Sequence, residues 1–221
     1  MAAPKLITLE QIPDWAQLIS LSLLEGLRLR DPYTYGHCRR VARNARLLAK
    51  SAGLGEWEQK KIEQAALFHD LGKIGIPDRV LLKPGKLTAD EETIIREHPI
   101  KSVEILQPLT RLSFFESLVP GILHHHERMD GCGYPYGLSG DDIPLMARII
   151  LIADTYDAMT TTRPYRKGMG QEFAYKELKK FAGRQFDAHL VQVFLQAHPT
   201  WGKLEEELSE EYISAHFRRA A

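Results

Sequence analysis

The 221-residue sequence has little cysteine, no long hydrophobic run and no excess of either charge. The two cysteines, Cys38 and Cys132, are too few for a disulfide framework, and we expect both to be reduced thiols of a cytoplasmic protein. The longest apolar stretch, residues 18–29, is broken by polar side chains and is too short to span a bilayer. The first eight residues lack a basic segment followed by an apolar one, so no signal peptide is predicted.

The balance of positive and negative charge disfavours polyanionic partners. The 29 Lys and Arg residues equal the 29 Asp and Glu residues, so the formal net charge is zero. Without a global positive field the chain is not drawn as a whole to DNA, RNA or an anionic membrane, and we expect none of them as a partner. An anionic small molecule would have to be attracted by local groups. The apolar share of 44% is typical of a soluble globular protein, and the length suits one large domain with or without an appendage.

Strand signals are nearly absent, and helical periodicity dominates. Helical spacing of apolar residues, or a helix-start signal, occurs in residues 41–52, 62–66, 88–97, 99–106, 119–123, 144–158 and 187–197. Two connections rich in Gly, Pro and Asp, residues 73–87 and 128–142, interrupt this pattern. Structureless loops of that length inside a compact domain are usually functional. The sequence therefore predicts an all-α bundle with two long functional loops.

Histidines and acidic residues lie on the apolar stripes of the predicted helices. His37 is four residues before Val41, and Asp154 is four residues after Ile150. The same spacing places further side chains on the inward faces, namely His69, His126 and Asp157. Burying an imidazole or a carboxylate without a partner costs several kcal/mol. Each residue alone could be a core residue satisfied by a hydrogen bond, but a shared cation explains the whole set.

The types of donor restrict the cation and its chemistry. Imidazole and carboxylate donors without paired thiolates suit Fe, Mn, Ni or Zn and disfavour a structural Cys-rich zinc site. Because the candidates exceed the usual ligand number of one ion, two metals bridged by Asp70 are the economical arrangement. Such a centre is typical of phosphoryl hydrolases, in which a bridging water becomes hydroxide for in-line attack on phosphorus. The alternative, a di-iron oxidase, is disfavoured because the paired Glu-x-x-His motifs of ferritin-like proteins are absent.

An ordered series of motifs covers most of the chain, from about residue 31 to residue 197. Its members are residues 31–37 (DPYTYGH), 69–78 (HDLGKIGIPD), 83–88 (KPGKLT), 98–99 (HP), 125–135 (HHERMDGCGYP), 153–158 (ADTYDA) and 163–166 (RPYR). In order and spacing the series resembles the HD-GYP family. The resemblance implies an HD-domain helical bundle and a metal-dependent phosphodiesterase of bacterial signalling. Its substrate would be cyclic di-GMP, opened to linear pGpG, with GMP as a candidate second product.

The resemblance also implies roles for individual residues. The implied ligands of the two divalent metals, Fe or else Mn or Ni, are His37, His69, Asp70, His98, His125, His126 and Asp154, with Asp70 as the bridge. Lys73 would contact a phosphate oxygen at the reacting centre, and Asp157 would either transfer a proton or orient a ligand histidine. Arg163 and Arg166 would bind the second phosphate of the substrate, the alternative being a solvated basic loop. Tyr134 would contact substrate from residues 128–142, which we name the GYP loop.

Some of the chain lies outside these assignments. Tyr33 stands where some relatives have Glu and bind a third metal, so we expect two metals. His124 is an extra histidine beside the His125–His126 pair, expected to pack near the ligands. Residues 1–30 are a predicted helical extension of the catalytic domain, residues 31–221, and residues 10–30 are a candidate homodimer helix.

Two alternatives to the main function stay open. The substrate could be another cyclic dinucleotide such as cyclic GMP-AMP, because metals and phosphate-binding cations do not distinguish bases. The chain could also be a silent cyclic di-GMP receptor that signals to a partner protein through the GYP loop. The presence of every ligand implied by the family favours catalysis.

Overall fold

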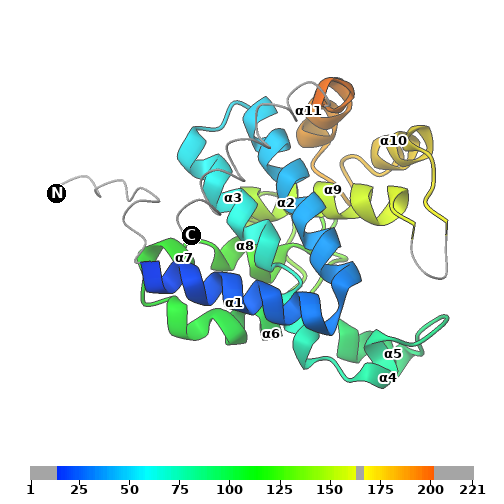
Figure 1. Cartoon of the computed structure of the whole chain (residues 1–221). Coiled ribbons are helices and arrows are strands. Elements are labelled where there is room, and N and C mark those ends of the chain that lie inside the picture. Colours follow the sequence, from blue (N-terminus) through cyan, green and yellow to red (C-terminus); the bar gives the residue numbers. More distant parts are fainter. Residues whose placement is uncertain (1–13, 163–166, 202–221) are drawn as a thin grey trace.

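A computed structural model describes residues 14–162 and 167–201 of the protein (Figure 1). The α-helices are α1 (Asp14–Arg30), α2 (Pro32–Ser51), α3 (Glu56–Phe68), α4 (Asp78–Leu81), α5 (Ala89–Ile95), α6 (His98–Leu106), α7 (Ser113–Glu116), α8 (Val119–His124), α9 (Leu145–Thr160), α10 (Gln171–Lys180) and α11 (Ala188–Ala197). Short 3-10 turns are η2 (Leu71–Gly75), η3 (Gln107–Leu109), η4 (Gly140–Asp142) and η5 (His198–Thr200). Within these described ranges there is no β-strand, so the predicted all-α class is confirmed.

Helix α2 is the centre of the bundle. It begins where the Asp31 carboxylate caps it by accepting hydrogen bonds from the backbone N–H groups of Tyr33 and Thr34. It packs against α1, α3, α9 and α11. The predicted apolar stripe is buried, since Val41, Ala45 and Leu48 have no exposed surface. Its other inward positions carry polar groups, which places functional side chains inside the bundle.

The two predicted loops contain more local structure than the sequence indicated. Residues 73–87 include the end of η2 and the short helix α4, and the GYP loop contains an isolated bridge between Asp130 and Ser139 and ends in η4. The turn after α3 lies directly on α6: a Cβ added at Gly72 would lie 2.1 Å from the carbonyl oxygen of His98. Glycine therefore permits the close approach that brings the end of α3 to the start of α6.

Helix α1 lies across α2 and η2 (Figure 1). Ala16 and Leu27 are the buried apolar residues of α1 among those described. Its other side exposes large apolar side chains, which are Trp15, Leu18, Ile19, Leu21 and Leu29. No helix in the described part of the chain is both long and apolar enough to cross a membrane.

Candidate metal centre

The side chains that the sequence proposed as ligands meet in one place, although they come from separate helices. The contributing positions are His37 on α2, His69 and Asp70 after α3, His98 at the start of α6, His125 and His126 after α8, and Asp154 on α9. They are buried, except His126 and Asp154, which are partly buried. Donor atoms of His98, His125 and His126 lie within 4.8 Å of one another, and those of His37, His69 and Asp70 form a second such group.

Asp70 lies between the two groups. Its Oδ1 atom is 3.1 Å from Nε2 of His98, which belongs to the first group. Its Oδ2 atom is 3.5 Å from Nε2 of His69 and 3.7 Å from Nε2 of His37, both in the second group. One carboxylate therefore presents an oxygen to each group, which is the arrangement that a bridging ligand requires.

Three of the imidazoles are oriented by the backbone. The Nδ1 atoms of His69, His98 and His125 lie 2.6 to 2.7 Å from the carbonyl oxygens of Ala66, Ile95 and Ile122, each three residues earlier in the chain. A carbonyl only accepts, so each Nδ1 carries the proton and each Nε2 presents a lone pair to the interior.

The inward nitrogens need a partner that the described residues do not supply. Nε2 of His98 and Nε2 of His125 face each other at 3.2 Å, so two lone pairs are opposed. Nε2 of His69 is buried and has no hydrogen-bond partner among the described residues. Buried polar atoms are normally satisfied, and a cation among these nitrogens would satisfy all three. The donor set therefore fits divalent metal ions.

The electrostatics keep these groups in their metal-binding forms. Burial lowers the pKa of His98 to about 3 and the pKa of His126 to about 4. Burial also holds the pKa of His125 well below its ordinary value. Burial alone would raise the pKa of Asp70, but Lys73 and the neighbouring histidines His69, His98 and His37 together outweigh it, and the net shift is well downward. At neutral pH His98, His125 and His126 are thus neutral imidazoles and Asp70 is an ionised carboxylate.

His37 is held by a carboxylate and not by a carbonyl. Its Nδ1 is 2.7 Å from Oδ2 of Asp157, and its Nε2 is 3.0 Å from Oδ1 of Asp154. Burial pulls the pKa of His37 down, but the hydrogen bonds with Asp154 and Asp157 outweigh it and raise the pKa to about 9. Asp157 also accepts from Nε of Arg40 at 2.7 Å, from a second Arg40 nitrogen at 3.0 Å and from Thr161 at 3.2 Å.

These contacts favour one of the two roles considered for Asp157. A carboxylate that accepts from His37, Arg40 and Thr161 has both oxygens engaged. Such an arrangement is typical of a group that orients a metal-ligating histidine. A proton-transfer group would instead need an oxygen directed at the substrate.

Lys73 and the GYP loop border the centre. Nζ of Lys73 is 2.5 Å from Oδ2 of Asp70, so the ammonium neutralises the candidate bridge. The ring of Tyr134 stacks on His126 with 4.6 Å between centroids, and the guanidinium carbon of Arg96 lies over the Tyr134 ring, 5.3 Å from its centroid. Tyr134 therefore covers one of the candidate ligands. Arg163 and Arg166 lie outside the described residues.

Glu127 stabilises the GYP loop through hydrogen bonds to its backbone. Its buried carboxylate accepts hydrogen bonds from the backbone N–H groups of Tyr136 at 2.7 Å and Leu138 at 3.0 Å. A Cβ added at Gly133 would lie 2.5 Å from backbone atoms of residues 126–128. The loop thus folds back onto its own start, which fixes Tyr134 over the site. His124 lies at the edge, with Nδ1 3.9 Å from Oε1 of Glu127.

Sequence reasoning assigned no role to three of these residues. Arg40 lies three residues after His37 on the same helix face, a spacing that could have indicated a shared partner. Glu127 follows the His125–His126 pair, and its position before a Gly-rich loop was the available signal. No pattern in the sequence indicates that Arg96 lies over Tyr134, because that contact depends on the path of the GYP loop.

Comparisons with known proteins show the family of this chain. A model of the HD domain family matches residues 23–190. The chain is 42% identical over 174 residues to the cyclic di-GMP phosphodiesterase response regulator RpfG of Xanthomonas campestris, covering 79% of this chain and 46% of that protein. It is 39% identical over 175 residues to 3'3'-cGAMP-specific phosphodiesterase 2 of Vibrio cholerae, covering 79% and 33%. A solved structure of a cyclic GMP-AMP specific phosphodiesterase of V. cholerae has a TM-score of 0.61 at 21% identity, covering 85% of this chain and 49% of that one. The chain therefore spans less than half the length of these relatives.

Proposed function

The chain belongs to the HD domain family, and on that premise we propose that it is a metal-dependent phosphodiesterase of cyclic dinucleotides. The favoured substrate is cyclic di-GMP, opened to linear pGpG, with GMP as the candidate second product. The observation that carries the proposal is the position of Asp70, which presents one oxygen to each of two buried groups of donor atoms. Two adjacent cation sites are the arrangement that in-line displacement at phosphorus uses.

The proposed ligands are the residues that converge on this point: His37, His69, Asp70, His98, His125, His126 and Asp154. Imidazole and carboxylate donors support Fe as the metal, with Mn or Ni as alternatives. When bound, two such cations would supply Lewis-acid stabilisation of phosphate charge and an activated water.

The other residues of the site position these groups and the substrate. Asp157, clamped by Arg40, fixes the ring of His37. Lys73 balances the charge of Asp70, and we propose that its ammonium also contacts a phosphate oxygen as charge develops in the transition state. Tyr134, stacked on His126, would present its ring edge and hydroxyl to the substrate. Arg163 and Arg166 remain the proposed contacts for the second phosphate.

Cyclic GMP-AMP is the second candidate substrate. Its support is the 39% identity to a protein named as specific for 3'3'-cGAMP. The donor atoms of the metal centre contact no base, so they do not separate the two substrates. The third candidate function is that of a cyclic di-GMP receptor without turnover, which would signal to a protein through the GYP loop. The exposed Tyr136 ring on that loop would suit contact with such a partner.

Product analysis distinguishes these candidates. The chain is purified without oxygen, loaded with Fe(II) or Mn(II), and incubated with cyclic di-GMP or 3'3'-cGAMP, and the products are separated by chromatography. We expect pGpG from cyclic di-GMP, and no product from Asp70→Ala. Faster hydrolysis of 3'3'-cGAMP would move the assignment to that substrate. Tight binding of cyclic di-GMP without product in either metal state would favour the receptor.

The division of the chain is also a proposal. Residues 31–221 would form the catalytic domain, and residues 10–30 would pair in a homodimer through the exposed apolar side of α1. Leu18 and Leu29 are 61% and 72% exposed. Replacing both with Glu should halve the mass measured by light scattering, whereas Glu25→Gln on the same helix should leave it unchanged. An unchanged mass in the Leu18→Glu, Leu29→Glu variant would contradict the homodimer.

A further inference from the structure

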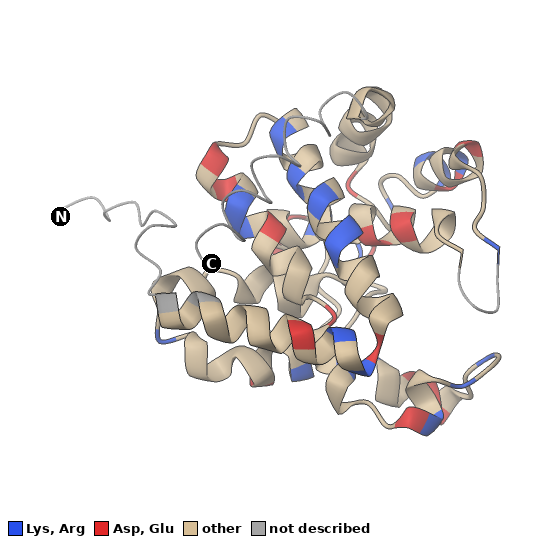
Figure 2. Cartoon of the chain, viewed as in Figure 1, with Lys and Arg blue, Asp and Glu red and all other residues tan. Residues whose placement is uncertain are grey.

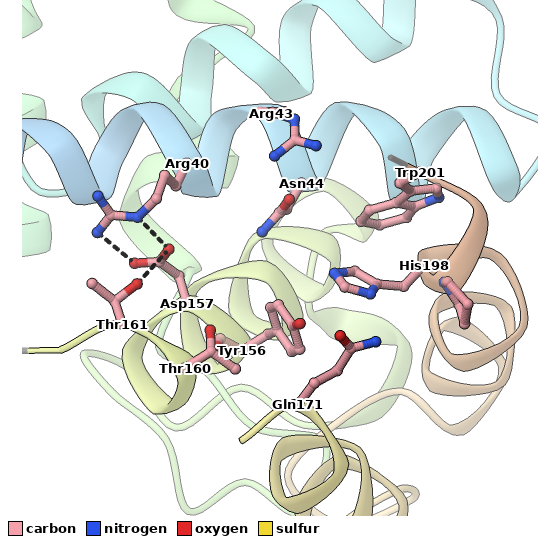
Figure 3. A pocket seen from close by; sticks show the side chains of 11 residues that line it. Arg40, Arg43, Asn44, Tyr156, Asp157, Thr160, Thr161, Gln171, His198 and Trp201 are labelled. Carbon is pink, nitrogen blue, oxygen red and sulfur yellow. Dashed lines mark hydrogen bonds and ion pairs between the residues drawn. The ribbon is translucent and has the colours of Figure 1, made fainter. Parts of the chain in front are cut away.

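A second cavity lies beside the metal centre, between α2, α9, α10 and η5 (Figure 3). Its volume is about 370 Å³, within the range of about 300 to 1,000 Å³ that is usual for small-molecule sites. Tyr156, Pro199 and Trp201 form an apolar part of its wall. The remainder is polar, and none of the proposed metal ligands lines it.

Several polar groups of the wall have hydrogen-bonding capacity to spare. Asn44 is only 7% exposed, and it lies on the wall of the cavity. Figure 3 shows its side chain directed into the space between Asp157 and Tyr156. Its amide is therefore placed to hydrogen-bond to a ligand or ordered water in the cavity.

His198 offers a donor to the same space. The amide of Gln171 donates to the hydroxyl of Tyr175, so the hydroxyl proton is available for Nδ1 of His198, 2.7 Å away. His198 then carries its own proton on Nε2, which has no partner among the described residues. Burial and the charge of Arg43 lower the pKa of His198 to about 4, so the ring is neutral at physiological pH.

The wall carries positive charge and little negative charge. Helix α2 provides the two basic residues of the wall, Arg40 and Arg43, and contains no acidic residue (Figure 2). Among the described residues that line the cavity, Asp157 is the one carboxylate, and it is engaged by Arg40, Thr161 and His37. A cavity with spare donors and a cationic wall favours an anion.

We propose that this cavity binds a small phosphate monoester, of the size of a nucleoside monophosphate. Asn44 and His198 would donate to its phosphate, beside the cationic wall, and the aromatic part of the wall would contact an attached ring. A phosphate alone would fill only part of the volume. The choice of GMP as the natural ligand rests on the proposed function, in which GMP is a product. The inference that the cavity binds a phosphate monoester does not rest on that function.

The cavity is coupled to the metal centre through shared contacts. Arg40 lines the cavity and holds Asp157, which in turn holds His37. An anion that draws the Arg40 guanidinium away from Asp157 loosens the support of His37. Binding in the cavity therefore lowers the affinity of the centre for metal and slows turnover.

Binding is tested by calorimetric titration of GMP, inorganic phosphate and guanosine into the full metal-loaded chain. The titration is repeated with Asp70→Ala, which disables the metal centre and so removes binding there. Asn44→Leu keeps the branched shape of the side chain and removes the amide, and His198→Phe keeps an aromatic ring and removes the imidazole N–H. His189→Phe, at an exposed position on α11, is the matched control. Circular dichroism checks that each variant is folded.

In the Asp70→Ala background we expect GMP to bind and phosphate to compete with it, while guanosine does not bind. Asn44→Leu or His198→Phe should weaken GMP about tenfold, as loss of one charge-assisted hydrogen bond would, and His189→Phe should not. The proposal would be overturned if folded Asp70→Ala did not bind GMP. It would also be overturned if Asn44→Leu and His198→Phe both bound GMP with the affinity of the Asp70→Ala parent. Because the titration needs no turnover, a chain that binds GMP but hydrolyses no cyclic dinucleotide would refute only the proposed function.

Coupling is tested by GMP inhibition of turnover at saturating substrate, where GMP cannot compete at the metal centre. We expect GMP to inhibit wild type, and the GMP concentration for half-maximal inhibition to be at least about tenfold higher in Asn44→Leu. Without GMP, the turnover of Asn44→Leu should equal that of wild type. Equal inhibition in the two proteins would overturn the coupling.

Discussion

Replacement of Asp157 by Asn separates an orienting role from a proton-transfer role. The Asp157 carboxylate accepts from His37, from two nitrogens of Arg40 and from Thr161. An amide presents only one acceptor oxygen, so at least one donor then faces an NH₂ group. Breaking a fully buried ion pair costs about 3 to 5 kcal/mol, but the Arg40 side chain is 41% exposed. We therefore expect a loss of stability of about 2 kcal/mol.

The orienting role makes a specific kinetic prediction. Loss of a partner that orients a ligand histidine lowers metal affinity about 10- to 100-fold. Asp157→Asn should therefore need more metal for half-maximal activity and recover most of its kcat at saturating metal. Asp141→Asn, an exposed acid with an ion pair to Arg148, is the control and should change neither value. The assays are a metal titration of turnover and urea unfolding. A kcat that stays about 100-fold low at saturating metal, with unchanged metal affinity, would refute the orienting role and favour proton transfer.

Three further predictions follow from the site. Wild type should retain about two equivalents of metal per chain, and Asp70→Ala should lose both this metal and all turnover. Elemental analysis measures the metal, and the product assay measures turnover. Replacing both Arg163 and Arg166 with Ala should leave metal content unchanged and raise the Kd for cyclic di-GMP at least about tenfold, and an unchanged Kd would return them to a solvated loop. In the metal-free chain, burial lowers the pKa of His98 to about 3 and of His126 to about 4. The unfolded chain titrates near about 6.5 and so binds more protons below that pH. Stability to urea should fall by about 1.4 kcal/mol per pH unit and per histidine as pH falls from about 6.5 to about 4, and a flat profile would contradict this.

Residue patterns predicted the all-α class and inward positions for His37, His69, His126 and Asp154, whereas His98 and His125 were implied as ligands by the family resemblance. The stripe of Val41, Ala45 and Leu48 is buried as predicted, and His37 lies on the same helix, facing the centre. The periodicity works because a bundle core accepts a polar group on an apolar stripe only where another group satisfies it. The resemblance to the HD-GYP family is confirmed by the family match and by the relatives.

What could not be predicted depends on contacts between distant segments. Arg40 and Asp157 are 117 residues apart, and no local spacing connects them. The second cavity is likewise formed where α2 meets η5, so Asn44 and His198 have no common pattern in the sequence. The contents of the two loops were missed for another reason: Gly, Pro and Asp indicate turns, and they do not exclude short helices such as α4 or a loop folded on Glu127.

The position of Asp70 explains why the centre depends on the packing of η2, the turn after α3, against α6. Asp70 and His69 are adjacent in the chain, yet Asp70 also reaches His98 because Gly72 lets the turn lie directly on α6. Ser102 reinforces this contact, since its hydroxyl donates to the carbonyl of His69 and accepts from the N–H of Gly72. Any side chain at residue 72 would push the turn off α6 and move the oxygens of Asp70 away from one group of donors. The bridge between the two groups is thus set by a backbone contact that contains none of the ligand atoms.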